Sequence, residues 1–142
     1  MEAKAYLRQL KRLDVCIKQK QQECDELRAA ACSIGATDYS KDKVLSSVDN
    51  EASFTKTIHR LEALMDEVNN QIDTYVDLKH KIINQIQQLQ NPKFIEILFK
   101  HYVEDKRLEQ VAVEMNYTYQ YVVELHGYAL VAFNNILLKT YI

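Results

Sequence analysis

Two pairs of side chains have the residue types and the spacing of metal ligands. Glu23 and Glu26 lie three residues apart, as do Asp77 and His80, so each pair would share one face of a helix. Pairs of this kind bind metals in helical-bundle enzymes, where several helices each contribute ligands. Because the sequence contains no complete ligand set, we interpret both pairs as solvated helix positions.

The cysteines do not form a second candidate site. Cys16, Cys24 and Cys32 follow one another at intervals of eight residues. On one helix such neighbours would be ~12 Å apart, which is too far for a disulfide. The sequence also has no Gly-rich phosphate loop, no nucleophile elbow and no Cys–His pairing. We therefore expect no cofactor, no bound metal and no enzymatic activity.

The stretch "EMNYTYQYVVELHGYAL", residues 114–130, has the pattern of a helix-turn-helix. Ala112 is small where two helices would cross, and Asn116 stands where the turn requires a positive φ. Thr118 suits the N-cap of the following helix. Such helices usually enter a DNA groove. Yet the sequence has no Lys or Arg between Leu108 and Leu138.

The composition indicates an all-α protein. Its 142 residues include only two Gly and one Pro, too few for a β-rich fold with many turns. The net charge of −2 gives no general attraction to nucleic acid or to an anionic membrane. No uninterrupted apolar run approaches the roughly 20 residues that span a bilayer. The first residues show no signal-peptide pattern, so we expect a soluble, cytoplasmic protein without a membrane partner.

Residues 1–90 have the periodicity of a coiled coil. Apolar residues alternate at spacings of three and four from Tyr6 to Ile34 and again from Phe54 to Leu89. The pattern predicts helices over 2–34 and about 52–90, folded into a long antiparallel hairpin around a polar loop at 35–50. Gly35 would end the first helix, and Lys20 would lie near Asp66. Since two helices bury only a narrow stripe, we expect a homodimer or a higher oligomer.

Residues 91–142 are predicted to form a small helix-turn-helix domain. Asn91 and Pro92 suit the N-cap and first position of a helix over 92–103. A second helix over 104–115 would be capped by Asp105, and a third would begin after Thr118. His126 is interpreted as a packed or hydrogen-bonded histidine beside a close helix approach at Gly127.

The segment "LFKHYVEDKRLEQVAVEMNYTYQYVVELHGYALVAF" resembles a family of small phage and prophage proteins. In that family a coiled-coil arm precedes a helix-turn-helix similar to region 4 of bacterial sigma-70 factors. The likeness extends to "AKAYLRQLKRLDVCI" and "DLKHKIINQIQQLQNPKF". Its most specific parts are Tyr102–Glu104, the turn from Ala112 to Asn116, and Leu125–Gly127 with Ala129 and Leu130. The resemblance implies a transcription regulator that acts at promoter DNA, on RNA polymerase, or on both.

The chain departs from the family pattern mainly in charge. Sigma-like helices have basic residues where this sequence has Tyr119, Tyr121 and Val123. This sequence also has Asp105 where the family usually has Gly, and Arg107 where the family usually has a helix-capping Thr. Residues 92–142 have five basic and six acidic side chains. Because phosphate neutralisation supplies most DNA affinity, direct DNA binding should be electrostatically weak.

Two sets of residues are therefore candidates for binding. The surface expected to contact a partner or DNA comprises Thr118, Tyr119, Gln120, Tyr121, Val123, Glu124 and Gly127. The residues expected to contact phosphates are Lys100, His101, Lys106 and Arg107. The leading hypothesis is a phage-type regulator that works at a promoter with RNA polymerase or another regulator. The alternative is an inhibitor or adaptor that uses the Tyr-rich helix only to bind proteins, since aromatic residues are enriched at interfaces.

Overall fold

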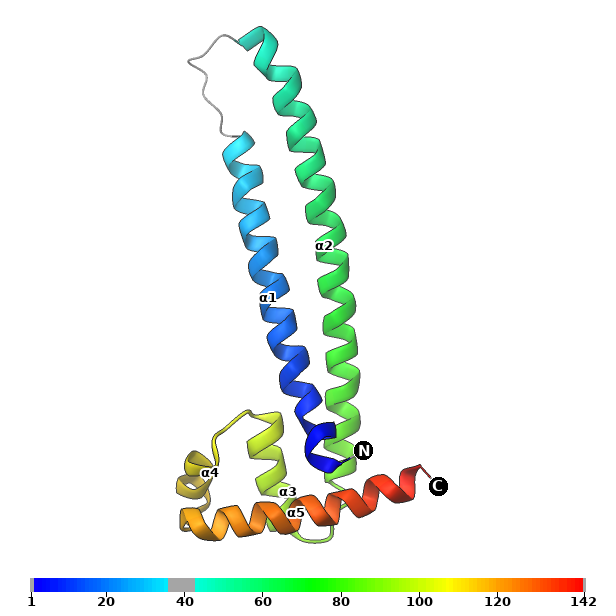
Figure 1. Ribbon diagram of the computed structural model, residues 1–142, viewed down its shortest axis with the longest axis vertical. Coiled ribbons are helices and arrows are strands. Elements are labelled where there is room, and N and C mark those ends of the chain that lie inside the picture. The colour runs from blue at the N-terminus through cyan, green and yellow to red at the C-terminus, as the bar shows by residue number, and fades with distance from the viewer. Residues whose placement is uncertain (1, 36–42, 142) are drawn as a thin grey trace. The chain divides into compact units, whose positions relative to one another are not determined.

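The computed structural model describes residues 2–35 and 43–141, and within these the protein is all-helical, without a β-strand (Figure 1). The elements are α1 (Ala3–Gly35), α2 (Lys43–Ile86), α3 (Pro92–Leu98), the π-helical turn η1 (Phe99–Val103), α4 (Leu108–Met115) and α5 (Tyr119–Thr140). The chain divides into two compact units, which are Val15–Asp73 and a larger unit of Met1–Asp14 with Thr74–Ile142. The domain boundary expected at 90/91 does not coincide with this division.

The unit Val15–Asp73 contains one segment of α1 and one segment of α2. A small hydrophobic cluster joins them, with Leu27 and Ile72 packed around the buried residues Cys24, Leu61, Leu64 and Val68. Lys20 Nζ lies 3.4 Å from Glu67 Oε2, so its partner is one residue beyond the expected Asp66. The alternating spacing of three and four residues that predicted this helix would place Met65 in the buried stripe, but Met65 is 40% exposed and Leu64 is buried instead.

The larger unit has the main hydrophobic core. Phe133 of α5 is fully buried there and its ring lies 6.2 Å from that of Tyr6 on α1. The Tyr6 hydroxyl donates a 2.7 Å hydrogen bond to Oε1 of Gln85, a buried side chain on α2. Buried residues from all the elements of the unit form the cluster, among them Leu7, Leu10, Ile82, Ile86, Ile97, Leu98, Val111, Val122, Leu125 and Ala129.

The ends of the long helices differ from the expectation. α2 begins at Lys43, so the predicted loop at 35–50 is wrong for residues 43–50, while 36–42 lie outside the described residues. Ser, Asp and Asn suggested a loop there, but their cost in a helix is only a few tenths of a kcal/mol each. Gly35 is the last residue of α1. The start of α3 is confirmed, because Asn91 Oδ1 accepts from the amide of Lys93 and Pro92 is the first helical residue.

The helix expected over 92–103 changes its form after Leu98. In η1 the Glu104 amide bonds to the Phe99 carbonyl at 3.0 Å, a π-helical contact. Asp105 then has φ 56°, so it turns the chain and does not cap the next helix as expected. A positive φ explains why Gly would suit this position, although Asp is among the residues that tolerate it. α4 starts only at Leu108, where Arg107 makes no side-chain cap hydrogen bond.

The turn between α4 and α5 follows the prediction. Asn116 has φ 60° and ψ 40°, the left-handed conformation expected there. The Tyr117 amide bonds to the Ala112 carbonyl at 3.0 Å, which closes the end of α4. Thr118 Oγ1 accepts a 3.2 Å hydrogen bond from the Tyr121 amide and so caps α5. Local sequence chemistry thus determines how α5 leaves α4.

Candidate functional site

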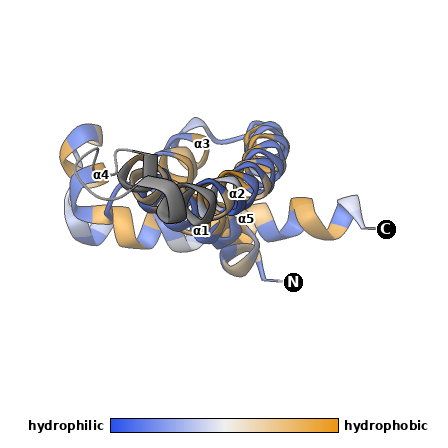
Figure 2. Ribbon diagram, turned by 90° about the horizontal axis from the view of Figure 1, so that it is seen from above, coloured by the Kyte–Doolittle hydropathy of each residue, from blue (hydrophilic) through white to orange (hydrophobic). Residues whose placement is uncertain are grey.

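Several large apolar and aromatic side chains of α5 are exposed to solvent. Hydrophobic and hydrophilic residues alternate along the ribbon of this helix in Figure 2. Tyr119 is 49% exposed, Tyr121 38% and Val123 41%, as their expected outward orientation requires. Tyr128 and Val131 extend this surface along the helix and are more exposed still. We call the set Tyr119, Tyr121, Val123, Tyr128 and Val131 the α5 outer face.

Tertiary structure adds a cation to this region. Lys93 Nζ of α3 lies 3.3 Å from the Tyr121 hydroxyl and 5.5 Å from the centre of the Tyr117 ring. The two Tyr rings meet edge to face with centres 4.9 Å apart. The hydrogen bond to Tyr121 is the main reason that the pKa of Lys93 is raised. Sequence spacing does not indicate this contact, because Lys93 and Tyr121 are 28 residues apart.

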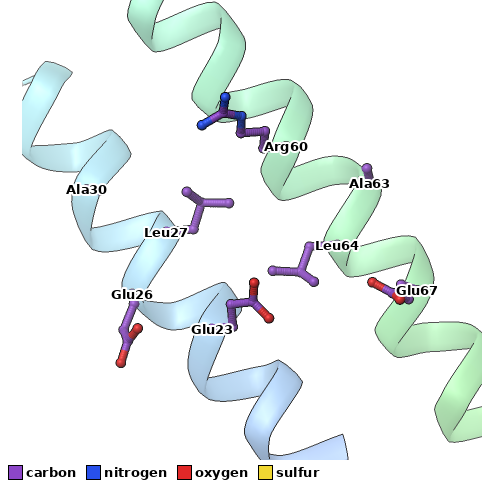
Figure 3. A pocket seen from close by; sticks show the side chains of 8 residues that line it. All are labelled: Glu23, Glu26, Leu27, Ala30, Arg60, Ala63, Leu64 and Glu67. Carbon is purple, nitrogen blue, oxygen red and sulfur yellow. The ribbon is translucent and has the colours of Figure 1, made fainter.

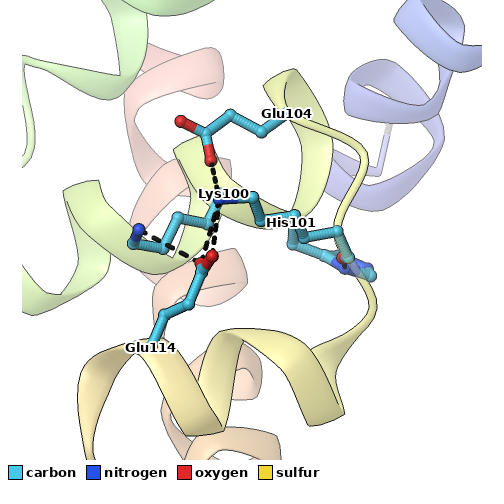
Figure 4. Close-up of polar contacts among 5 residues, drawn as sticks. Lys100, His101, Glu104 and Glu114 are labelled. Carbon is cyan, nitrogen blue, oxygen red and sulfur yellow. Dashed lines mark hydrogen bonds and ion pairs between the residues drawn. The ribbon is translucent and has the colours of Figure 1, made fainter.

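Two of the four expected phosphate contacts are engaged in ion pairs (Figure 4). Lys106 Nζ lies 2.8 Å from Glu104 Oε2 and 2.8 Å from Glu114 Oε1. Lys100 Nζ lies 3.3 Å from Glu114 Oε2. These contacts raise the pKa of Lys106 and lower that of Glu114. Lys100 and Lys106 therefore connect η1 and the turn after it to Glu114 of α4, and a phosphate would have to compete with two carboxylates for them.

The other two expected phosphate contacts differ from each other. His101 Nδ1 lies 2.7 Å from the Lys106 carbonyl oxygen. Since a carbonyl can only accept, Nδ1 must hold the hydrogen of this bond. Arg107 is exposed at the start of α4. Of the four residues, only Arg107 is exposed, so it is the most accessible to a phosphate.

The remaining residues of the expected binding surface have different roles. Thr118 is the N-cap of α5, as described above. Gln120 and Glu124 are exposed, and Glu124 adds negative charge beside the α5 outer face. Gly127 is exposed, and a Cβ atom added to it would meet nothing within 4 Å. The expected close helix approach at Gly127 is therefore wrong, because the residue faces away from the packed side of the helix.

His126 lies beside Tyr102 and His101 on the inner side of this corner. Its Nε2 is 2.8 Å from the Tyr102 hydroxyl, and the two rings are stacked with centres 5.6 Å apart. The His101 ring meets that of His126 edge to face at 5.1 Å. Burial lowers the pKa of His126 to about 4, with smaller contributions from His101, Lys4 and Arg8. Burial also raises the pKa of Tyr102 to about 12. The interpretation of His126 as a packed, hydrogen-bonded residue is confirmed.

The weaker candidates for chemistry lie apart from this corner. Glu23 and Glu26 line an open groove of about 580 Å³ within Val15–Asp73 (Figure 3). Glu23 Oε2 lies 3.8 Å from Lys20 Nζ. His80 Nε2 lies 3.2 Å from the side-chain amide of Asn84. The described part of the chain has no group of three or more His, Cys, Asp or Glu side chains that could hold a metal ion. All three cysteines are free.

The length and composition of α5 would also allow it to cross a membrane. No such segment was expected, because no apolar run in the sequence approaches roughly 20 residues. In the structure one side of α5 is packed in the core of the larger unit, with Val122, Leu125, Ala129, Phe133 and Leu137 buried. A core helix of a globular protein acquires the same composition in this way.

Comparisons of the chain with protein-family models, with curated proteins and with solved structures found no match.

Proposed function

We propose that this protein is a transcription regulator of the phage type that acts by binding a protein partner through the α5 outer face. In this proposal α4, the Asn116 turn and α5 form a helix-turn-helix similar to sigma region 4. The α1 and α2 helices form an antiparallel hairpin that serves as an arm. The partner would be RNA polymerase or another regulator in the cytoplasm, and the protein itself would have no enzymatic activity.

The composition of the α5 outer face supports this proposal most directly. Three of its five exposed residues are Tyr, a residue type enriched at the centre of protein interfaces. Tyr side chains also lose little conformational entropy on binding, because they have only two rotatable bonds. The nearby side chains of Lys100 and Lys106 already form ion pairs with Glu104 and Glu114. A partner surface that offers apolar pockets and hydroxyl-binding groups would complement this face.

Direct DNA binding is the second candidate, and the positions of two cations favour it. Lys93 lies within reach of Tyr121, and Arg107 is exposed at the start of α4. Both cations belong to the same unit as the α5 outer face. Two phosphate contacts would give only a small share of the affinity of an ordinary DNA-binding domain. We therefore place DNA contact after protein binding.

A pull-down from host lysate tests which macromolecule is bound. We expect the wild-type protein to retain a protein partner after nuclease treatment. The variant Val123→Glu should lose it, because a buried carboxylate without a matching cation is costly at an interface. Val76→Glu is the matched control, since Val76 is 55% exposed on α2 and is not part of the α5 outer face. Loss of every partner after nuclease treatment would instead favour DNA as the ligand.

The arm is proposed to pair with a second copy of the chain. Phe54 and Met65 are each 40% exposed, and the groove in Figure 3 has Leu27 and Leu64 among its lining residues. Two helices that bury so narrow a seam gain stability from further helices.

Light scattering at low micromolar concentration should give about twice the chain mass of 16.6 kDa. Met65→Lys should shift the protein toward monomer, whereas Gln19→Lys adds the same charge at an exposed position and should not. A monomer mass for the wild-type protein would refute pairing through the arm.

A further inference from the structure

A small cavity lies within the larger unit, between the start of α1 and the turn η1. Leu7, Arg8 and Lys11 line it from α1, and His101, Tyr102 and Asp105 from the other side. Its volume is about 160 Å³, equal to roughly five water molecules at ~30 Å³ each. Pockets for drug-sized ligands are at least about twice as large. The size suits a tetrahedral oxyanion of five heavy atoms.

The charge around the cavity is mainly positive. No hydrogen bond or ion pair joins the Arg8 guanidinium to another residue that the structure describes. Lys4, Arg8 and Lys11 are spaced to share one side of α1, and the charges of Lys4 and Arg8 contribute to the low pKa of His126. The carboxylate of Asp105 opposes them, at 3.2 Å from Lys11 Nζ. Both partners of that ion pair are more than half exposed, so breaking it costs little.

The wall opposite Arg8 is held rigidly. The hydrogen bond from His101 Nδ1 to the Lys106 carbonyl oxygen holds the imidazole ring in place. The second ring nitrogen, Nε2, takes no part in this hydrogen bond. The Tyr102 ring meets His101 edge to face at 4.6 Å, and its hydroxyl is engaged by His126. Both His101 and Tyr102 belong to the π-helical turn, and π-helical turns are frequent at functional sites. The His101 and Tyr102 side chains on this wall of the cavity are thus held in place by their neighbours.

We propose that this cavity binds a small phosphate-type oxyanion. The Arg8 guanidinium supplies the main hydrogen bonds, since its planar fork matches two oxygens of such an anion. Lys11 turns from Asp105 toward the ligand. His101 Nε2 accepts a hydrogen bond from a P–OH group of the anion, because Nδ1 holds the ring hydrogen. The ligand is free orthophosphate or the phosphate of a mononucleotide, because both present the same group. The residues of this site are not part of the α5 outer face. A test of phosphate binding is therefore independent of the function proposed above.

NMR titration of the full-length protein with sodium phosphate tests the site, with sodium chloride at equal ionic strength as the reference. We expect phosphate alone to shift the amide signals of residues 7–11 and 101–106. Arg8→Gln should weaken binding about tenfold, the effect of one charge-assisted hydrogen bond. Arg12→Gln removes the same charge from an exposed position on α1 that does not line the cavity, and it should leave the affinity within about twofold. Asp105→Asn should tighten binding, because it removes the opposing carboxylate.

A parallel titration with a nucleoside monophosphate distinguishes the two sources. Equal shifts and equal affinity would assign the site to the phosphate group alone, whereas tighter binding of the monophosphate would assign it to a nucleotide. The proposal is overturned if chloride produces the same shifts, or if phosphate produces none through the millimolar range. It is also overturned if Arg12→Gln weakens binding as much as Arg8→Gln, since the effect would then be one of net charge.

Discussion

A double substitution on α5, Tyr119→Arg with Val123→Arg, is expected to turn a very weak DNA binder into a clearly salt-dependent one. Wild-type protein should bind random duplex DNA no better than the nonspecific range of ~10⁻⁴–10⁻⁶ M at physiological salt. Each new phosphate contact adds about 0.9 to the salt slope, so two contacts add nearly two units. Between about 50 and 200 mM salt the variant should therefore lose roughly tenfold more affinity than the wild type. Fluorescence anisotropy with a labelled duplex measures both quantities.

The choice of positions follows from the tertiary contacts. Tyr121 is left unchanged, because an Arg there would meet Lys93, whose Nζ now lies 3.3 Å from the Tyr121 hydroxyl. Gln19→Arg with Gln22→Arg adds the same charge at exposed positions of α1 and should give a smaller gain. Nanomolar binding by the wild-type protein with a steep salt slope would show that Lys93, Arg107 and the basic residues of α1 already suffice. Protein docking would then no longer be the leading function.

The second large effect is expected in acid. The pKa of His126 is about 4 in the folded protein, below its ordinary value of 6.5. As the pH falls from 6.5 toward 4, the unfolded chain therefore takes up a proton that the folded protein does not. The stability contributed by neutral His126 is present above pH 6.5 and is lost over this range. At ~1.36 kcal/mol per pH unit the full difference in pKa corresponds to ~3.4 kcal/mol, and because His126 is only partly buried the loss should be about 2 kcal/mol.

Urea denaturation between pH 7 and pH 4.5 measures this loss, and NMR of the imidazole gives the pKa itself. His126→Gln should lose less stability than wild type over that interval, because Gln does not titrate. His59→Gln is the matched control, since the His59 side chain is 72% exposed. Equal pH dependence of the wild type and His126→Gln would show that carboxylates alone control stability in acid, with Glu114 the leading candidate because Lys106 lowers its pKa.

The sequence by itself determined the features that depend on neighbouring residues. The scarcity of Gly and Pro indicated an all-helical protein, and the caps at Asn91 and Thr118 and the left-handed turn at Asn116 formed as predicted. These are local contacts within one to three residues, so residue type alone selects them. The outward orientation of Tyr119, Tyr121 and Val123 was also predictable, because it follows from helical periodicity once the start of α5 is known.

Tertiary structure decided the features that depend on residues far apart in the chain. The contact of Lys93 with Tyr121, the ion pairs of Lys100 and Lys106 with Glu114, and the cavity between α1 and η1 each join separate elements. The π-helical turn and the positive φ of Asp105 were not predicted either, because the packing around them outweighs weak local preferences. The sequence gives the number of basic and acidic residues. Whether a lysine is available to bind a phosphate depends on the carboxylate that folding places beside it.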